Sequence, residues 1–275
     1  MARRDLLWCP MPSSNSVRLG LELEVLIRTA AHRIRASRRT VALTGAGLSV
    51  ESGIPPFRRG LAGGASLWER YDPMEYGTID AFVRDPGRVW LMLRELAYTL
   101  GAASPNEGHR ALARLEWEGL LARVITQNVD GLHQKAGSRE VLEFHGNWRT
   151  LSCLGCARKV PSETVPLLRL PPRCPCGGVL KPDVTLFGEI IPAALIDAAY
   201  EEARTCDVLL VIGTSAEVAP AAWIPSMARD RGACLIEINL EQTPLTASMV
   251  DVSLRGPAAV ILPRLAEEAG LRAAN

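Results

Sequence analysis

The stretch that decides the fold is Val41-Ala-Leu-Thr44, which is followed at once by Gly45-Ala-Gly47-Leu-Ser49. The short apolar run predicts a buried strand, and the two glycines predict a tight turn into a helix. Glycines at such a turn let backbone N–H groups approach a pyrophosphate at the positive end of a helix. Val50 stands where the usual dinucleotide fingerprint has its third glycine. The turn alone therefore leaves open a phosphate site or an ordinary tight turn.

Further short apolar runs recur along the chain, separated by stretches of helical length. This alternation is typical of a parallel sheet that helices cover on both faces. The first helix is predicted over residues 19–35, and Ser104-Pro105-Asn106-Glu107 predicts the capped start of another. We therefore predict an α/β fold with a Rossmann-like, doubly wound parallel sheet, whose other strands are expected at residues 123–126, 141–144, 207–212, 233–238 and 251–254.

Two long segments interrupt this alternation of strands and helices. Residues 54–103 are Gly-rich at first and helical afterwards, and residues 148–181 contain four cysteines. The economical architecture is a large domain with a smaller inserted module, part helical and part zinc ribbon. We expect the large domain to comprise residues 19–57, 104–147 and 182–265. The small module is expected to comprise residues 58–103 and 148–181. Residues 1–18 are expected to form an N-terminal arm.

The four cysteines are arranged as Cys153-Leu-Gly-Cys156 and Cys174-Pro-Cys176. Two close pairs suit tetrahedral Zn²⁺, whose thiolate ligands lie at about 2.3 Å, although the second pair is one residue shorter than the usual spacing. The alternative is two disulfides in a secreted protein. Residues 1–20 lack the continuous apolar stretch of a signal peptide, so we expect a reducing, cytoplasmic location. Four thiolates leave no open coordination position, which predicts a structural zinc.

Composition excludes several classes of protein. The 275 residues are 48% hydrophobic and 22% charged, which is typical of a globular chain rather than a disordered one. No apolar run approaches the roughly 20 residues that cross a bilayer, so we expect no membrane span. The 31 basic and 30 acidic residues give a net charge of +1. A sequence-independent nucleic-acid binder would carry a large basic surplus, which this chain lacks, and no specific nucleic-acid partner is expected.

Polar side chains follow two of the predicted strands. Gln127, Asn128 and Asp130 come after the strand at 123–126, and His145 follows the strand at 141–144. In doubly wound folds ligands bind at the carboxyl ends of strands, so these side chains face the expected site. A lone histidine is more often structural than catalytic. The position of His145 and an ordinary imidazole pKa near 6.5 nevertheless favour a general base, whereas the other three are read as structural: His32, His109 and His133.

Eight motifs occur in order over residues 20–265: GAGLS (45–49), GIPPFR (53–58), TQNVD (126–130), HG (145–146), the four cysteines, KPDVTLFGE (181–189), GTS (213–215) and INLEQTPLT (238–246). Each motif is weak by itself, but coincidence cannot account for all eight in this order. Together they resemble the sirtuin family, in its bacterial type. The resemblance implies an NAD-dependent protein-lysine deacylase with a Rossmann-like domain and a small zinc-bearing module, which is also the architecture predicted above.

The resemblance also implies a role for individual residues. His145 would be the general base, Gln127 and Asn128 would contact the nicotinamide ribose, and Asp130 the carboxamide. Val184 and Phe187 would line the acyl-lysine tunnel. The peptide would add a strand between the loops that contain Gly188, Glu189 and Val218. The remaining contacts to NAD would come from Gly45, Ala46, Gly47, Ser49, Phe57, Arg58, Gly213, Thr214, Ser215 and Asn239, and the zinc ligands would be Cys153, Cys156, Cys174 and Cys176.

The implied reaction begins when the acyl oxygen of a modified lysine attacks C1′ of the ribose and nicotinamide leaves. This first attack forms an imidate. His145 then draws a proton from the ribose hydroxyls, and the 2′ oxygen attacks the imidate. The products are free lysine, O-acyl-ADP-ribose and nicotinamide. The expected partner is an acylated protein or peptide, and the metal takes no part in the chemistry.

The helix after Pro86 departs from one subgroup of the family in an informative way. That subgroup carries a Tyr and, three residues later, an Arg that grip negatively charged acyl groups, whereas here Leu93 and Leu96 occupy these positions. A carboxylate buried against two leucines would lack a partner. We therefore expect acetyl or longer apolar acyl groups to be preferred over succinyl. The neighbouring Arg94 would reverse this expectation if it, and not Leu93, faced the acyl group.

Three other functions are compatible with parts of the sequence. The same NAD site could serve mono-ADP-ribosyl transfer to protein. A non-catalytic NAD-binding scaffold is a second alternative, but a degenerate site would be expected to lose at least one of Asn128, Asp130 and His145. A third is a nucleic-acid module built on the zinc ribbon, whose basic residues are more simply explained as a solvated face.

Overall fold

The strand β1 (Thr40–Thr44) lies inside the larger of two sheets in the computed structural model, which describes residues 20–56 and 67–270. The six strands of this sheet are all parallel, in the order β3-β2-β1-β7-β8-β9. Chain order reverses between β1 and β7, which is where doubly wound sheets bind ligands. The predicted fold class is thus confirmed. The other strands are β2 (Arg123–Thr126), β3 (Val141–Glu143), β7 (Val208–Ile212), β8 (Cys234–Asn239) and β9 (Val252–Arg255).

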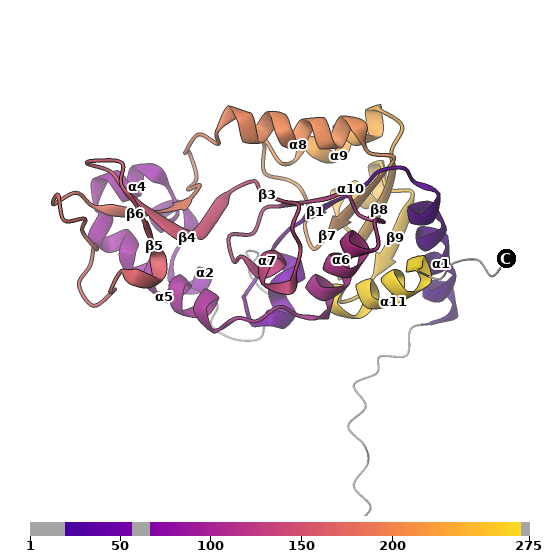
Figure 1. Ribbon diagram of the computed structural model, residues 1–275, viewed down its shortest axis with the longest axis horizontal. Coiled ribbons are helices and arrows are strands. Elements are labelled where there is room, and N and C mark those ends of the chain that lie inside the picture. The colour runs from indigo at the N-terminus through magenta and orange to yellow at the C-terminus, as the bar shows by residue number, and fades with distance from the viewer. Residues whose placement is uncertain (1–19, 57–66, 271–275) are drawn as a thin grey trace, which may run out of the picture.

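Helices cover both faces of this sheet, as Figure 1 shows. Side chains alternate between the faces along each strand. Val41 and Leu43 pack in the core under α8 (Ala193–Thr205) and α9 (Trp223–Asp230), whereas Ala42 packs in the opposite core. That second core is covered by α1 (Leu21–Ala36), α6 (Glu107–Trp117) and α11 (Ala258–Gly270). Burial on both faces explains why the strands read as continuous apolar runs.

A smaller antiparallel sheet lies at the end of the molecule away from α1 and α11 (Figure 1). Its strands are β4 (Gly146–Cys153), β5 (Lys159–Pro161) and β6 (Leu180–Val184), with η2 (Ser162–Thr164) after β5. Trp90 and Phe82 pack against Leu151 and Leu180 in one core, and the Trp90 indole donates a hydrogen bond to the Leu180 carbonyl oxygen (2.9 Å). The two inserted segments therefore pack together. The helices of this part are α2 (Leu67–Arg70), α3 (Pro73–Tyr76), α4 (Ile79–Arg84) and α5 (Pro86–Ala102).

Two local predictions need correction. The turn after β1 leads into a 3₁₀ helix, η1 (Ala46–Ser52), rather than an α-helix. The cap of α6 is Asn106 and not Ser104, because the Asn106 Oδ1 accepts the backbone N–H of Gly108 (2.9 Å) while its Nδ2 donates to the Leu48 carbonyl oxygen (2.7 Å). That second bond ties α6 to η1. The remaining helices are α7 (Leu132–Ala136) and α10 (Pro244–Ser248). Within residues 20–56 and 67–270, no helix is both long and apolar enough to cross a membrane.

Candidate active site

One cavity of about 730 Å³ opens at the carboxyl ends of β1, β2, β7 and β8. The residues that the sequence pointed to for NAD and substrate come together on its lining: Gly45, Ala46, Gly47, Ser49, Gln127, Asn128, Asp130, His145, Val184, Phe187, Gly188, Glu189, Gly213, Thr214, Ser215, Val218 and Asn239. Phe57 and Arg58 lie outside the described residues. Parallel strands thus gather loops from distant parts of the sequence around one space.

The glycines after β1 are required by a close approach of two loops. A Cβ on Gly47 would lie 2.7 Å from the Gly213 Cα, and one on Gly213 would lie 2.4 Å from the Leu48 nitrogen. Gly213 also has φ +59°, which disfavours other residues. The Gly47 N–H donates to the Gly213 carbonyl oxygen (2.8 Å). The turn after β1 is therefore locked against the turn after β7 before any ligand is considered.

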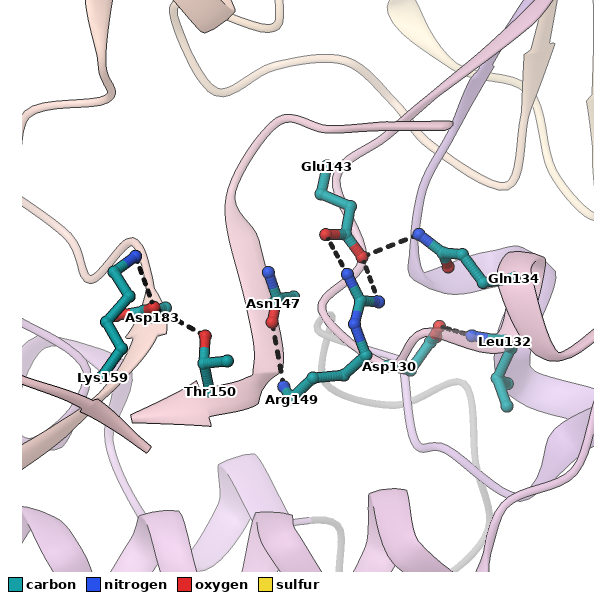
Figure 2. Close-up of polar contacts among 9 residues, drawn as sticks. All are labelled: Asp130, Leu132, Gln134, Glu143, Asn147, Arg149, Thr150, Lys159 and Asp183. Carbon is teal, nitrogen blue, oxygen red and sulfur yellow. Dashed lines mark hydrogen bonds and ion pairs between the residues drawn. The ribbon is translucent and has the colours of Figure 1, made fainter. Parts of the chain in front are cut away.

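A chain of polar side chains links the turn after β1 to the loop after β2. The Ser49 hydroxyl donates to the Asp130 Oδ2 (2.7 Å) and accepts from the Asn128 Nδ2 (3.1 Å), which also lies 3.1 Å from the Gly45 carbonyl oxygen. The Asp130 Oδ1 accepts the Leu132 N–H (2.9 Å), as Figure 2 shows. Burial raises the pKa of Asp130, while its hydrogen bonds oppose the rise. These contacts fix the Asn128 and Asp130 side chains at the cavity wall.

Thr214 organises the other end of the cavity. Its hydroxyl oxygen accepts hydrogen bonds from the Gln127 Nε2 (3.0 Å) and the Ala216 N–H (3.0 Å), and its carbonyl oxygen accepts from the Asn239 Nδ2 (3.2 Å). The loops after β2, β7 and β8 are thereby joined. Gln127 and Asn239 thus have their amide N–H groups partly used within the protein, and each also faces the cavity.

His145 lies two residues after the end of β3, on the cavity wall. Its Nδ1 is 3.1 Å from the Gln127 carbonyl oxygen. A carbonyl can only accept, so Nδ1 carries the proton and Nε2 is left with its lone pair. Burial lowers the pKa of His145 below 6.5, and the bond to Gln127 only partly opposes this. The ring is therefore neutral near pH 7 and can accept a proton at Nε2.

An ion pair clamps the turn that carries His145. The two terminal nitrogens of Arg149 lie 2.6 Å from the two Glu143 carboxylate oxygens, and the Gln134 Nε2 donates to the same carboxylate (2.9 Å; Figure 2). Elements β3, β4 and α7 thus meet at one carboxylate. Gly146 closes the turn with φ +77°, where a Cβ would lie 2.0 Å from the Asp183 carbonyl oxygen. No other residue fits there without moving β6.

The cavity has an apolar end between α5 and the segment after β6. Leu93 and Leu96 both line it, and Arg94 does not, which agrees with the register predicted for α5. Among the described residues, the lining contains no lysine or arginine. Sequence reasoning missed several members of this wall, because no local signal shows which face of a segment meets the cavity: Ile54, Met92, Leu100, Val129 and Leu186.

Two histidines lie beneath the cavity, packed edge to face with ring centroids 5.1 Å apart. The His109 Nε2 is 3.5 Å from the Ser49 Oγ, and the His133 Nε2 is 3.0 Å from the Thr44 Oγ1. Burial lowers the pKa of His109 to about 4 and that of His133 to about 3. Both rings are neutral in the folded protein, in keeping with the structural role predicted for them.

We expect these two histidines to make the fold less stable in acid. Between pH 6.5 and the lowered values the unfolded chain binds more protons, so stability is complete above pH 6.5 and is lost as the pH falls. Each histidine should remove about 2 kcal/mol from the free energy of unfolding between pH 7.5 and 5. Urea unfolding at pH 7.5 and 5.0 measures the loss. His133→Gln should show a smaller loss than the unmodified chain; an equal loss in both would contradict this explanation.

The four cysteines form a compact cluster where β4 ends at Cys153, and the other three lie outside the strands of the small sheet. Their sulfur atoms all lie within 4.8 Å of one another, with 3.5 Å between Cys153 and Cys176 and 3.8 Å between Cys156 and Cys174. Four thiolates around Zn²⁺ at about 2.3 Å would be separated by about 3.8 Å. The separations exclude disulfides, whose sulfurs lie about 2 Å apart. The cluster therefore fits one tetrahedral zinc ion held entirely by the protein.

Comparison with known proteins tests the family resemblance that the motifs indicated. A model described as the Sir2 family matches residues 45–220. The chain belongs to the Sir2 family. The NAD-dependent protein deacylase 2 of Pyrobaculum aerophilum is 48% identical over 240 residues, which cover 86% of this chain and 94% of the relative. The resemblance to the sirtuins is thus confirmed.

Solved Sir2 structures share the architecture as well. A Sir2 homologue in complex with NAD superimposes with a TM-score of 0.81 at 42% identity, covering 88% of this chain and 93% of the other. Sir2Af2 bound to a myristoylated histone peptide gives a TM-score of 0.74 at 36% identity, covering 90% and 97%. This Sir2 protein therefore has the fold of relatives whose structures hold NAD or an acylated peptide.

Proposed function

We propose that this chain is an NAD-dependent protein deacylase that removes acyl groups from lysine side chains in the cavity at the carboxyl ends of β1, β2, β7 and β8. The observation that carries the proposal is the joining of three features in one cavity. The glycine turns and side-chain amides can bind a dinucleotide, the buried neutral histidine can act as a general base, and the apolar end can hold an acyl chain. NAD, when bound, supplies the ADP-ribose that accepts the acyl group.

The residues that would hold NAD divide between two ends of the cavity. The turn at Gly45, Ala46, Gly47 and Ser49 offers backbone N–H groups for the pyrophosphate. Gly213, Thr214, Ser215 and Asn239 would hold the adenosine half. This assignment is supported by the hydrogen bonds through Thr214, which fix the second group of loops before the ligand arrives. Asn128 would then contact the nicotinamide ribose, and Asp130 the carboxamide.

His145 would act as the general base. Its Nε2 would take a proton from a ribose hydroxyl, while the Gln127 carbonyl oxygen holds the protonated Nδ1 and stabilises the imidazolium that forms. The lowered pKa keeps the base unprotonated near neutral pH. Glu143 and Arg149 keep the turn, and with it the ring, in place.

The acylated peptide would enter between the loops at residues 186–189 and 216–218. Gly188, Glu189 and Val218 line the cavity there, and an added strand would bind through backbone hydrogen bonds that tolerate varied sequences. Residues 58–103 and 148–181 would form a small domain beside the NAD-binding domain. We place the protein in the cytoplasm, where a reducing environment keeps the four cysteine thiols reduced and able to bind zinc.

Acetyl and apolar acyl groups are expected to be better substrates than succinyl. The described lining offers no cation, so a succinyl carboxylate would be buried beside Leu93 and Leu96 without a partner. We expect kcat/KM for a succinylated peptide to be about 100-fold below that of the acetylated peptide, which corresponds to about 3 kcal/mol. Assaying acetyl, myristoyl and succinyl forms of one peptide with saturating NAD measures the ratio.

A pair of variants on α5 tests the same claim. Leu96→Arg places a cation at the apolar end and should raise the succinyl-to-acetyl ratio of kcat/KM at least tenfold. Leu91→Arg is the control, because Leu91 is exposed on α5 and does not line the cavity. Equal turnover of the succinylated and acetylated peptides by the unmodified chain would contradict the acyl preference and leave deacylation itself intact.

A further inference from the structure

Lys181 has a buried ammonium group whose three donors are all engaged. Its side chain is 7% exposed, at the start of β6. The Nζ lies 2.8 Å from the Val184 carbonyl oxygen, 3.1 Å from the Pro182 carbonyl oxygen and 2.9 Å from the Glu189 Oε2. Lysine is rarely buried unless it is paired, because its charge is costly to remove from water. Lys181 thus links β6 to the turn at residues 186–189.

Glu189 closes that turn. Its Oε2 accepts the Leu186 N–H (2.9 Å) as well as the lysine, and its own N–H donates to the Leu186 carbonyl oxygen (3.0 Å). Gly188 between them has φ +79°. Residues 186–189 all line the cavity. The ion pair therefore sets the shape of the loop on which the peptide is proposed to dock.

The strand that carries Lys181 ends beside the general base. The Thr185 N–H donates to the His145 carbonyl oxygen (2.8 Å), and Val184 pairs with Gly146 in the small sheet. The Lys181 ammonium binds the Val184 carbonyl on one side and the Glu189 carboxylate on the other. It thus fixes the distance between the backbone at His145 and the turn at residues 186–189.

We propose that Lys181 and Glu189 form a positioning pair that sets the depth and register of the acyl-lysine relative to His145. The inference rests on the proposed deacylase function and adds to it a determinant of peptide binding. Lys181 touches no reacting atom, so its effect should fall on the peptide and not on NAD. The residues proposed to hold NAD belong to other loops, after β1, β2, β7 and β8.

A second ion pair, between Lys159 on β5 and Asp183 on the strand that carries Lys181, provides a matched control. The Lys159 Nζ lies 3.0 Å from the Asp183 Oδ2, and Asp183 also accepts hydrogen bonds from the Thr150 and Ser152 hydroxyls (2.6 and 2.5 Å). Figure 2 shows Lys159, Asp183 and Thr150 together on the small sheet. The Lys159 side chain is 69% exposed, and neither it nor Asp183 lines the cavity.

The test compares Lys181→Met, Glu189→Gln and Lys159→Met in the full chain by steady-state kinetics with an acetylated peptide. One series varies the peptide at saturating NAD, and the other varies NAD at saturating peptide. Lys181→Met should raise KM for the peptide and lower kcat/KM by about 10- to 100-fold, since displacements near 1 Å have effects of this size. KM for NAD should change by less than about twofold for all three variants, and Lys159→Met should match the unmodified chain.

Glu189→Gln should also raise KM for the peptide, by a smaller factor, because the amide oxygen can still accept the Leu186 N–H. The double variant should be no worse than Lys181→Met alone, as expected for residues that act as a unit. Should Lys181→Met fail to fold, Glu189→Gln carries the test, since its side chain is only partly buried. An unchanged peptide KM in Glu189→Gln, or equal rises in both KM values, would overturn the positioning role. Absence of deacylation in the unmodified chain would instead overturn the proposed function.

Discussion

Replacing His145 by Ala is expected to lower kcat for deacylation by about 10²- to 10⁴-fold, the usual contribution of a general base. The side chain lies on the cavity wall with its Nδ1 on the Gln127 carbonyl oxygen, so the variant removes the Nε2 that would receive the proton. The folded protein and its NAD-binding loops should persist, because those loops are joined to one another through Thr214 and Gly213, whereas the histidine side chain adds one hydrogen bond, to the Gln127 carbonyl oxygen.

Two measurements separate loss of the base from loss of the site. NAD binding by calorimetry should change little in His145→Ala, and His32→Ala, which alters an exposed position on α1, should keep full activity. Because burial lowers the pKa of His145, the acid limb of kcat/KM in the unmodified chain should lie below pH 6.5. Deacylation retained in His145→Ala would show that another group accepts the proton.

Loss of one zinc ligand is expected to have a comparably large effect, through the fold. Zinc binding to structural sites of this kind supplies apparent free energies of about 10–16 kcal/mol at neutral pH. In Cys174→Ser we expect the bound zinc to be lost and the small sheet to unfold. The apolar end of the cavity should then lose its shape, since β6 and the segment after it form one of its walls.

Metal analysis and proteolysis test this expectation. The purified chain should contain one zinc per molecule, and Cys174→Ser should contain almost none and be cleaved rapidly within residues 148–181. Cys234→Ser is the matched control, because Cys234 lies in β8 away from the cluster and should retain zinc and activity. A Cys174→Ser chain that is stable, metal-free and active would show that the cluster holds no structural metal.

The large sheet could be predicted because its signals are local and repeated. Each strand is a short apolar run, and the runs alternate with helix-length segments, so β1, β2, β7 and β8 are found close to their predicted positions. The small sheet gave a weaker signal. Its strand β4 is mostly half-buried and pairs with residues of β6 that lie 27 to 38 positions later in the chain, and only the cysteines marked the region. Local rules are also insufficient at α11: they would end a helix before Pro263, but this residue lies inside the helix.

The site was predictable as a set of residues and less so as a set of contacts. Order along the chain placed Gly47, Asn128 and His145 at strand ends, and the parallel sheet brings them to one cavity. Sequence alone could not show that Gly47 packs on Gly213, since that contact joins turns 166 residues apart. For the same reason the lysine of KPDVTLFGE gave no sign that it would be buried against Glu189.

The most direct test of the central claim is a product balance with the purified chain, NAD and an acetylated lysine peptide. We predict that nicotinamide, free-lysine peptide and O-acetyl-ADP-ribose form in a 1:1:1 ratio, and that none forms when NAD is omitted. Nicotinamide release with labelled ADP-ribose attached to protein, and no free-lysine peptide, would contradict deacylation and establish ADP-ribosyl transfer in its place.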